Sequence, residues 1–272
     1  MTAPEWRQVT IAFPDPDAAE QAASTHLLPI LAEAEARQLI TTWFYVRKGD
    51  WRVRYLSALT IDADRYVIDE LKRLTSDRNI CGAVPGIYEP EVHAFGGPEA
   101  MDAAHQLWHH DSRHLLTHRT DRESARQRET SIVLSAVMMR AAALDWYEQG
   151  DVWARVADLR DPPRPGSVDA LLNAARRLLT VDPASLTRQE GSLAGYQTLI
   201  EAYTCAGDTL RNLHQTGKLH RGMRATLAHH VIFAWNRRSI PGLQQAALAA
   251  AAKTVVFGPD PTLGALTPGG AS

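Results

Sequence analysis

Residues 43–55 read Trp-Phe-Tyr-Val-Arg-Lys-Gly-Asp-Trp-Arg-Val-Arg-Tyr, two runs of aromatic and basic residues around a single turn. Gly49-Asp50 has the order expected of a two-residue hairpin loop, because glycine at the first position adopts the positive φ of a type II′ turn. The stretch therefore predicts a β-hairpin with strands over 40–47 and 51–57, around which the rest of the fold can be arranged.

The basic residues of this hairpin fall on one face if the loop has two residues. Arg47 then lies opposite Arg52 and Tyr45 opposite Arg54, and all four side chains point to the same side because side chains alternate along a strand. Like charges directly opposite each other destabilise a sheet. Three guanidiniums on one face therefore favour an anion, a carboxylate or phosphate held by two donors. The alternative is a solvated face paired with nearby Asp or Glu residues.

The segments around the hairpin alternate between strand and helix patterns. A strand over 6–13 and a helix over 15–37 precede it, and a second helix over 62–75 and an extended segment over 86–94 follow it. The order β-α-β-β-α-β is the ferredoxin-like pattern. From Gly97 onward the pattern is helical, so the sequence predicts an α+β fold, a ferredoxin-like portion followed by a mainly helical portion.

Apolar periodicity predicts the helices after Gly97, and composition predicts the character of the last residues. The expected helices cover 99–118, 122–147, 152–159, 168–179, 193–215, 221–237 and 241–253. Residues 259–272 carry few core-forming side chains, so we expect a disordered tail.

The composition is that of an ordinary globular protein and excludes several classes. Of the 272 residues, 45% are hydrophobic and 22% charged, and the net charge of −2 argues against a general nucleic-acid binder. Two cysteines, Cys81 and Cys205, make no disulfide framework. The first residues resemble no signal peptide and no apolar run is long enough for a bilayer, so we expect a cytoplasmic protein with no membrane contact.

Histidines gather between positions 105 and 118. His105 and His109 are four residues apart, as are His110, His114 and His118, so two stripes run along one expected helix. Such pairs can bind zinc, but the metalloprotease motif needs Glu after the first histidine, and no third ligand is marked. We expect solvated or hydrogen-bonded histidines, and no metal or other cofactor.

Two other segments place titratable groups together. In an extended chain Glu89, Glu91 and His93 project to one side, where the carboxylates can tune an imidazole for acid–base chemistry or instead neutralise the hairpin arginines. On the later helix His229 and His230 point about 100° apart. A buried, hydrogen-bonded histidine is the plain interpretation of either.

Four blocks resemble the C-terminal elimination domain of lantibiotic dehydratases, and most of all its stand-alone relatives, called thiopeptide-type bacteriocin biosynthesis proteins. The blocks are WFYVRKGDWRVRY (43–55), YEPEVHAFGG (88–97), AMDAAHQLWHHDS (100–112) and AHHVIFAWNR (228–237). The likeness spans roughly residues 5–257, which implies a single domain of this family over residues 1–258.

The resemblance implies modification of a ribosomally made peptide. In split dehydratases one protein transfers glutamate from glutamyl-tRNA to a peptide Ser or Thr, and a second eliminates it to leave dehydroalanine or dehydrobutyrine. The expected partners are therefore the precursor peptide and a separate glutamylating protein, with no direct contact to nucleic acid. Arg47, Arg52 and Arg54 match the family arginines of the hairpin. We predict a site with catalytic residues Arg52, Arg54, His229 and His230, and substrate-binding residues Tyr45, Arg47, Tyr88, Glu91 and His93.

Three positions depart from the family pattern. Ala94 stands where the family has arginine before aromatic-Gly-Gly, Ile232 where full-length dehydratases have a late histidine, and Trp51 where the hairpin has histidine. Either a histidine such as His93 takes over, or the chemistry differs. Two alternatives to elimination stay open: a pyridine synthase joining two dehydroalanines by formal [4+2] cycloaddition, and a non-catalytic accessory protein that presents the peptide.

Overall fold

A computed structural model describes residues 5–58, 60–118, 121–188, 191 and 193–258. Its N-terminal part is a four-stranded antiparallel sheet with strand order β2-β3-β1-β4. The strands are β1 (Glu5–Ala12), β2 (Ile40–Lys48), β3 (Asp50–Ser57) and β4 (Gly82–Gly86). With the helical connections described below, this is the ferredoxin-like arrangement that the sequence predicts.

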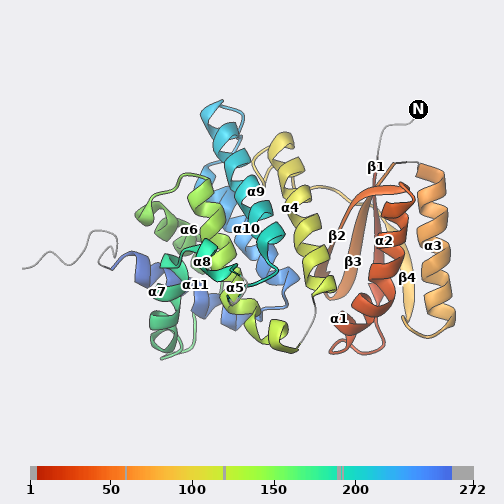
Figure 1. Cartoon of the computed structure of the whole chain (residues 1–272), viewed down its shortest axis with the longest axis horizontal. Coiled ribbons are helices and arrows are strands. Elements are labelled where there is room, and N and C mark those ends of the chain that lie inside the picture. The colour runs from red at the N-terminus through yellow and green to blue at the C-terminus, as the bar shows by residue number, and fades with distance from the viewer. Residues whose placement is uncertain (1–4, 59, 119–120, 189–190, 192, 259–272) are drawn as a thin grey trace, which may run out of the picture.

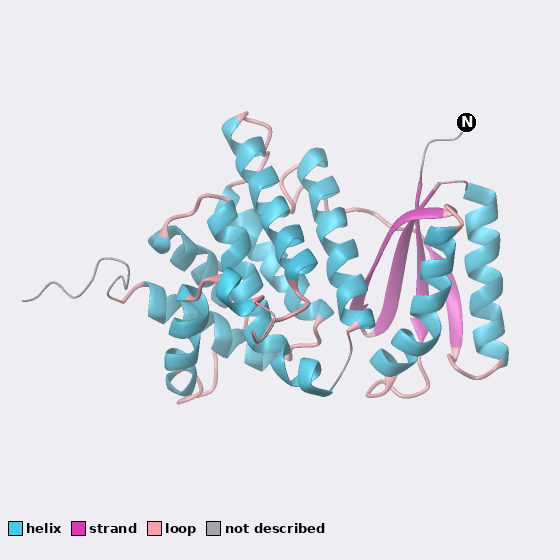
Figure 2. Cartoon of the chain, in the orientation of Figure 1, coloured by secondary structure: helices cyan, strands magenta, loops and turns pink. Residues whose placement is uncertain are grey.

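Helices cover one face of the sheet and fill the other half of the molecule (Figures 1 and 2). A continuous segment of α1 (Ala19–Ala22), a π-helical turn (Ala23–Leu27) and α2 (Leu28–Ala36) precedes β2, and α3 (Thr60–Ser76) precedes β4. The helical half then comprises α4 (Pro98–Thr117), α5 (Asp121–Ala141), α6 (Trp146–Asp158), a 3₁₀ turn (Asp169–Leu171), α7 (Leu172–Thr180), α8 (Pro183–Leu186), α9 (Gln197–Gln215), α10 (Met223–Arg237) and α11 (Gly242–Val256).

The hairpin has a tighter register than its loop signature predicts. Lys48 pairs with Asp50 and Arg47 with Trp51, so Gly49, at φ +75°, stands alone at the turn. This one-residue shift moves Arg47 away from Arg52 and Arg54, because alternate residues face opposite sides. The predicted common face of Tyr45, Arg47, Arg52 and Arg54 is therefore wrong.

The hydrophobic pattern explains the shift. In the observed register the buried side chains of Trp43, Tyr45, Trp51, Val53 and Tyr55 lie together on the face covered by α1–α3. A two-residue loop would split this group between core and solvent, at a cost of about 1.5–3 kcal/mol for each large apolar side chain left exposed.

The helical half covers the opposite face of the sheet only in part, at Phe44 of β2, and leaves Arg52 and Arg54 of β3 half-buried on what we call the open face. Phe44, between Trp43 and Tyr45, is buried in the core of the helical portion. Helix α4 runs along the outer edge of β2, where Ser112 Oγ accepts the amide of Tyr45 at 3.3 Å and His109 Nδ1 lies 3.0 Å from the carbonyl oxygen of Trp43. The helix thus covers an edge that would otherwise expose backbone hydrogen-bonding groups.

A buried ionic network ties α4 to α10. Asp111, with no exposed surface, accepts from Arg237 Nε at 2.8 Å, from Arg238 Nη2 at 2.5 Å and from the hydroxyl of Tyr203 at 3.1 Å. Burial alone would raise the pKa of Asp111, but the two guanidiniums lower it to about 2. The carboxylate is therefore ionised and holds the end of α10 against α4.

Two segments differ from the sequence prediction. The strand expected over 86–94 ends at Gly86, and residues 92–96 form turns, so Glu89, Glu91 and His93 do not form a strand stripe. The expected helix 122–147 ends at Ala141, Ala143 adopts φ +62°, and Asp145 begins α6 with a reciprocal capping box to Glu148. The predicted disordered tail, 259–272, lies outside the described residues.

Candidate active site

The open face of the sheet carries Arg52 and Arg54, two positions apart on β3. Arg54 lies beside β1, where its Nε donates to Gln8 Oε1 at 2.8 Å. Its guanidinium lies over the ring of Tyr88, 4.1 Å from the centroid, and 5.5 Å from that of Phe44. One side-chain amide and two aromatic rings therefore hold the guanidinium in a fixed plane.

Both arginines lack a carboxylate partner among the described residues. Arg54 uses only Nε, and neither Arg52 nor Arg54 is within 4.0 Å of a described Asp or Glu oxygen. Burial lowers the pKa of Arg54, Tyr88 and Glu91 raise it, and Arg52 lowers it, but an arginine remains charged. A half-buried pair of cations with free terminal nitrogens matches the two-donor geometry that a carboxylate accepts.

A tyrosine–histidine pair lies beside Arg54. The hydroxyl of Tyr88, in the loop after β4, is 2.8 Å from Nε2 of His105 on α4. Burial, with the charge of Arg54, lowers the pKa of His105 to about 4, and burial raises the pKa of Tyr88. At neutral pH the imidazole and the phenol are therefore both uncharged, and a proton can be shared between them.

His105 is fixed by aromatic neighbours on both elements. Its ring centroid lies 4.3 Å from that of Trp6 on β1 and 5.6 Å from that of Phe44 on β2. These ring contacts hold the His105 side chain in the aromatic cluster that packs against Arg54.

Glu91 interacts electrostatically with Arg54 and with His229 on α10. Its exposed carboxylate also acts on Tyr88. His229 lines a hollow of about 210 Å³ together with Arg221, whose Nη1 donates to the carbonyl of Ala94 at 2.6 Å. Burial, and then Arg221, lowers the pKa of His229, so the ring is neutral at pH 7.

The tautomer of His229 decides its chemistry. Nδ1 lies 3.2 Å from the carbonyl of Ala225 and 3.3 Å from Nη1 of Arg221. When Nδ1 carries the proton it donates to Ala225, and Nε2 keeps a free lone pair that can accept a proton.

Three of the residues expected in the site, Tyr45, Arg47 and His230, do not lie beside Arg54. Arg47 pairs with Glu20 and Ser239 and lies 4.4 Å over Trp51, on the helix-covered face, where Tyr45 is also buried. His230 is 3% exposed and packs against Phe95, with its pKa lowered to about 3 by burial. His93 is exposed. Tyr45 and His230 are thus buried, and Arg47 lines a separate hollow of about 570 Å³ on the helix-covered side of the sheet.

Two glycines at the start of α4 serve a close chain contact. Gly96 and Gly97 have φ +96° and +113°, and a Cβ on Gly97 would stand 2.8 Å from Nδ1 of His220. The amide of His220 also donates to the carbonyl of Gly96 at 2.8 Å. The segment before α10, rather than an anion, therefore packs on this end of α4.

The histidine stripes of α4 point to separate neighbours. His105 contacts Tyr88, His109 contacts Trp43 and Glu35, and His114 stacks on His118. Within the described part of the chain no group of three His, Cys, Asp or Glu side chains could hold a metal ion. The hydrogen-bonded histidines that the sequence predicts are found at His105 and His109.

The chain belongs to the family described as lantibiotic biosynthesis dehydratase C-term, whose model matches residues 6–256. That membership supports a dehydratase-type role in the maturation of a ribosomally made peptide. No curated protein sequence matches this chain. In the part of the chain that the structure describes, no helix is long and apolar enough to cross a bilayer.

Two solved structures share the fold. The first is the tRNA-dependent lantibiotic dehydratase MibB from Microbispora sp. 107891, with 15% identity and a TM-score of 0.56. The match covers 94% of this chain and 29% of MibB, so the chain spans less than a third of that protein. The second, TsrL, is 14% identical with a TM-score of 0.59, and the match covers 94% of this chain and 95% of TsrL. At these identities the likeness establishes the fold alone.

Proposed function

We propose that this protein removes glutamate from glutamylated Ser or Thr residues of a ribosomally made precursor peptide, leaving dehydroalanine or dehydrobutyrine. A base takes the Cα proton, its electron pair forms the Cα=Cβ double bond, and the Cβ–O bond breaks to release glutamate as a carboxylate. The step is redox-neutral. It requires a base, a hydrogen-bond donor that stabilises negative charge on the peptide carbonyl, and cations that stabilise the departing carboxylate.

The pair of arginines on the open sheet face is the observation that carries this proposal. Arg52 and Arg54 lie within 4.0 Å of no described carboxylate oxygen, and Gln8 and Tyr88 hold the Arg54 guanidinium in place. Guanidiniums positioned before the reaction stabilise charge as it develops, without the reorganisation that water requires. We assign the guanidiniums of Arg52 and Arg54 to binding the carboxylates of the glutamyl group, the anionic end of the substrate.

The proton chemistry is assigned to two neutral groups, Tyr88 beside Arg54 and His229 on α10. His229, in the tautomer that donates to Ala225, is the candidate base, since its lowered pKa leaves Nε2 free at neutral pH. The hydroxyl of Tyr88, bonded to His105, is the candidate donor to the peptide carbonyl as enolate character develops.

Arg221 supports elimination despite the loss of the family arginine at position 94. Its guanidinium reaches from the segment before α10 to the carbonyl of Ala94. A cation thus stands beside the position where the family pattern has one, although it comes from a different segment of the chain.

The proposal is tested by incubating the purified protein with a peptide that carries glutamate on one serine. We expect a product lighter than the serine peptide by one water, together with free glutamate. Release of glutamate with recovery of the serine peptide would indicate hydrolysis. Binding without conversion would indicate the accessory role, and either result contradicts the proposal.

A pyridine synthase is the second candidate, favoured by the aromatic and uncharged surroundings of Arg54. Trp6, Phe44 and Tyr88 lie edge to face within 6 Å of one another, and Tyr88–His105 is neutral. A cycloaddition of two dehydroalanines needs a hydrogen bond to one amide rather than an anion site. A peptide with two dehydroalanines should then react, while Arg52→Gln should leave that reaction unchanged.

The division of labour implies a partner. A protein that receives an ester made elsewhere must meet the glutamylating enzyme, if only transiently. Pull-down of the separate glutamylating protein tests this, whereas tight, salt-sensitive binding of tRNA to this chain alone would count against it.

A further inference from the structure

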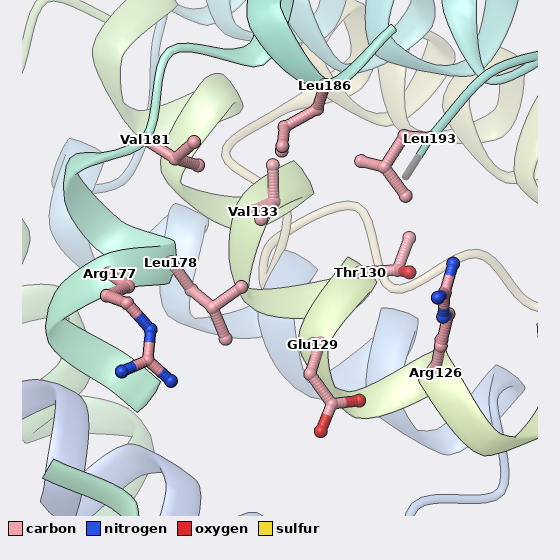
Figure 3. Close-up of a pocket in the computed structure, with 9 residues that line it drawn as sticks. All are labelled: Arg126, Glu129, Thr130, Val133, Arg177, Leu178, Val181, Leu186 and Leu193. Carbon is pink, nitrogen blue, oxygen red and sulfur yellow. The ribbon is translucent and has the colours of Figure 1, made fainter. Parts of the chain in front are cut away.

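A row of four residues crosses the open face of the sheet at Arg54. In the strand register Gln8 of β1 lies between Arg54 of β3 and Gly86 of β4. Phe44 of β2, on the other side of Arg54, closes the row at the helical half. The apolar hollow beside α5, whose lining residues Figure 3 shows, contributes no residue to this row. The row therefore belongs to the sheet alone, and variants in it leave that hollow unaltered.

The neighbouring row places uncharged residues beside Arg52 as well. Thr10 of β1 lies beside Arg52, and Val84 of β4 follows Thr10. No described carboxylate oxygen lies within 4.0 Å of either arginine, although Glu91 acts on Arg54 from a greater distance. Opposite charges on facing strands stabilise a sheet. Uncharged neighbours on β1 forgo that gain and leave both positive charges available to an external anion.

The side-chain amide of Gln8 holds Arg54 in one orientation. Arg54 Nε is a donor and cannot accept, so the Gln8 atom 2.8 Å from it is the amide oxygen Oε1. With Nε occupied, the two terminal nitrogens of Arg54 are the donors left for a ligand. They form a planar pair that matches the two oxygens of a carboxylate.

Gly86 provides the space for the Gln8 amide. It does not adopt a positive φ, so its backbone conformation is open to other residues. A Cβ at this position would stand 3.2 Å from Gln8 Nε2, closer than an ordinary van der Waals contact. A larger residue at position 86 would therefore displace the Gln8 side chain without straining the backbone.

We infer that Gln8 determines which acyl group the site accepts, in addition to orienting Arg54. An uncharged acceptor fixes the guanidinium without neutralising it, so the arginine pair selects the side-chain carboxylate of a glutamyl group over the carboxamide of a glutaminyl group. A carboxylate at position 8 would hold the same Nε and would also repel the carboxylate of the ligand. The inference rests on the proposed function in naming the glutamyl group as the ligand.

The test measures binding apart from elimination. Two fluorescein-labelled core peptides carry 2,3-diaminopropionate in place of the modified serine, acylated through the α-carboxyl group of glutamate in one and of glutamine in the other. The resulting amide does not leave as the ester does, so fluorescence anisotropy with the full chain reports affinity. We expect the wild-type protein to bind the glutamyl peptide about tenfold or more tightly than the glutaminyl peptide, since only the first offers a carboxylate to the arginines.

Two substitutions at position 8 separate charge from geometry. Gln8→Glu keeps an oxygen that accepts from Arg54 Nε, yet it should raise the Kd of the glutamyl peptide about tenfold or more and remove the preference, while the melting temperature does not fall. Gln8→Met removes the acceptor but adds no charge, so it should weaken the preference by less than Gln8→Glu does. Gly86→Ala, which displaces the amide, should act in the same direction as Gln8→Met, with an unchanged melting temperature. Gln106→Glu adds the same charge at an exposed position of α4 and, as the matched control, should leave both Kd values unchanged.

The outcomes separate this inference from the proposed function. A Gln8→Glu variant that keeps the wild-type preference would overturn the inference, because a merely structural Gln8 predicts that result. No preference in the wild-type protein would overturn it as well, together with the assignment of Arg52 and Arg54 to the glutamyl carboxylate. A wild-type preference that Gln8→Glu removes, with no glutamate released from the ester-linked peptide, would support the inference and contradict the proposed function.

Discussion

Arg54→Lys is the substitution that tests the site most sharply. Lysine keeps the charge, but it loses the Nε donor to Gln8 and the planar fork that donates to two carboxylate oxygens. A lost contact of this kind costs ~3 kcal/mol in the transition state, a fall in kcat on the order of a hundredfold. The loss of the 4.1 Å stacking on Tyr88 costs only about 0.5–1 kcal/mol of stability, a few degrees of melting temperature.

Two controls accompany this variant. Arg65→Lys, exposed on α3, should change neither activity nor stability. Arg47→Lys should lower the melting temperature, because Arg47 binds Glu20 and Ser239 on the covered face, yet it should keep kcat. Elimination assays by mass spectrometry and thermal melts measure both quantities. If Arg54→Lys eliminates normally, or if Arg47→Lys abolishes activity without loss of stability, the assignment of the open face is wrong.

Three further outcomes follow from the buried titratable groups. Asp111→Ala should lower the free energy of unfolding by about 3–5 kcal/mol in urea titrations, since it leaves Arg237 and Arg238 buried without their carboxylate, and retention of wild-type stability would contradict this. The pKa of Asp111 is lowered to about 2 in the folded state, compared with about 4 in the unfolded state, so the ionised carboxylate stabilises the fold above pH ~4. This contribution to stability should be lost as the pH falls toward 2. The pKa of His230 is lowered to about 3, so between pH 6.5 and pH 3 only the unfolded state binds a proton there, and the free energy of unfolding should fall over this range. His230→Leu should remove this contribution to the pH dependence and raise the free energy of unfolding by ~1 kcal/mol, because both ring nitrogens of His230 are buried without a partner among the described residues. An unchanged pH profile of stability would count against it.

The sequence predicted the architecture because that depends on local periodicity. The ferredoxin-like order and most helices of the second half follow from apolar spacing. The predicted hairpin register is wrong because burial of the alternating aromatic residues, and not the turn signature, determines the strand pairing. Trp43 and Tyr45 on one strand, and Trp51, Val53 and Tyr55 on the other, mark the buried face in the sequence itself, and this signal would have separated Arg47 from Arg54.

The site was only partly predictable because it joins distant segments. Arg52 and Arg54 came from the hairpin, and His229 from a helix motif. Gln8, His105 and Arg221 were missed as site residues. Their roles depend on contacts across 46, 17 and 127 positions of the chain, to Arg54, Tyr88 and Ala94 respectively. Such contacts leave no mark in local spacing.

The central claim is that the open face performs elimination rather than hydrolysis or cycloaddition. The most direct measurement uses a peptide glutamylated on a serine that carries deuterium at Cα, with the product followed by mass spectrometry. The account predicts free glutamate and a dehydroalanine peptide lighter than the deuterated serine peptide by one HDO, because the Cα deuterium leaves with the Cβ oxygen substituent. Both glutamate release and deuterium loss should be abolished in a variant carrying Arg52→Lys and Arg54→Lys. A glutamylated peptide that stays intact, or a serine peptide that retains its deuterium, would contradict it.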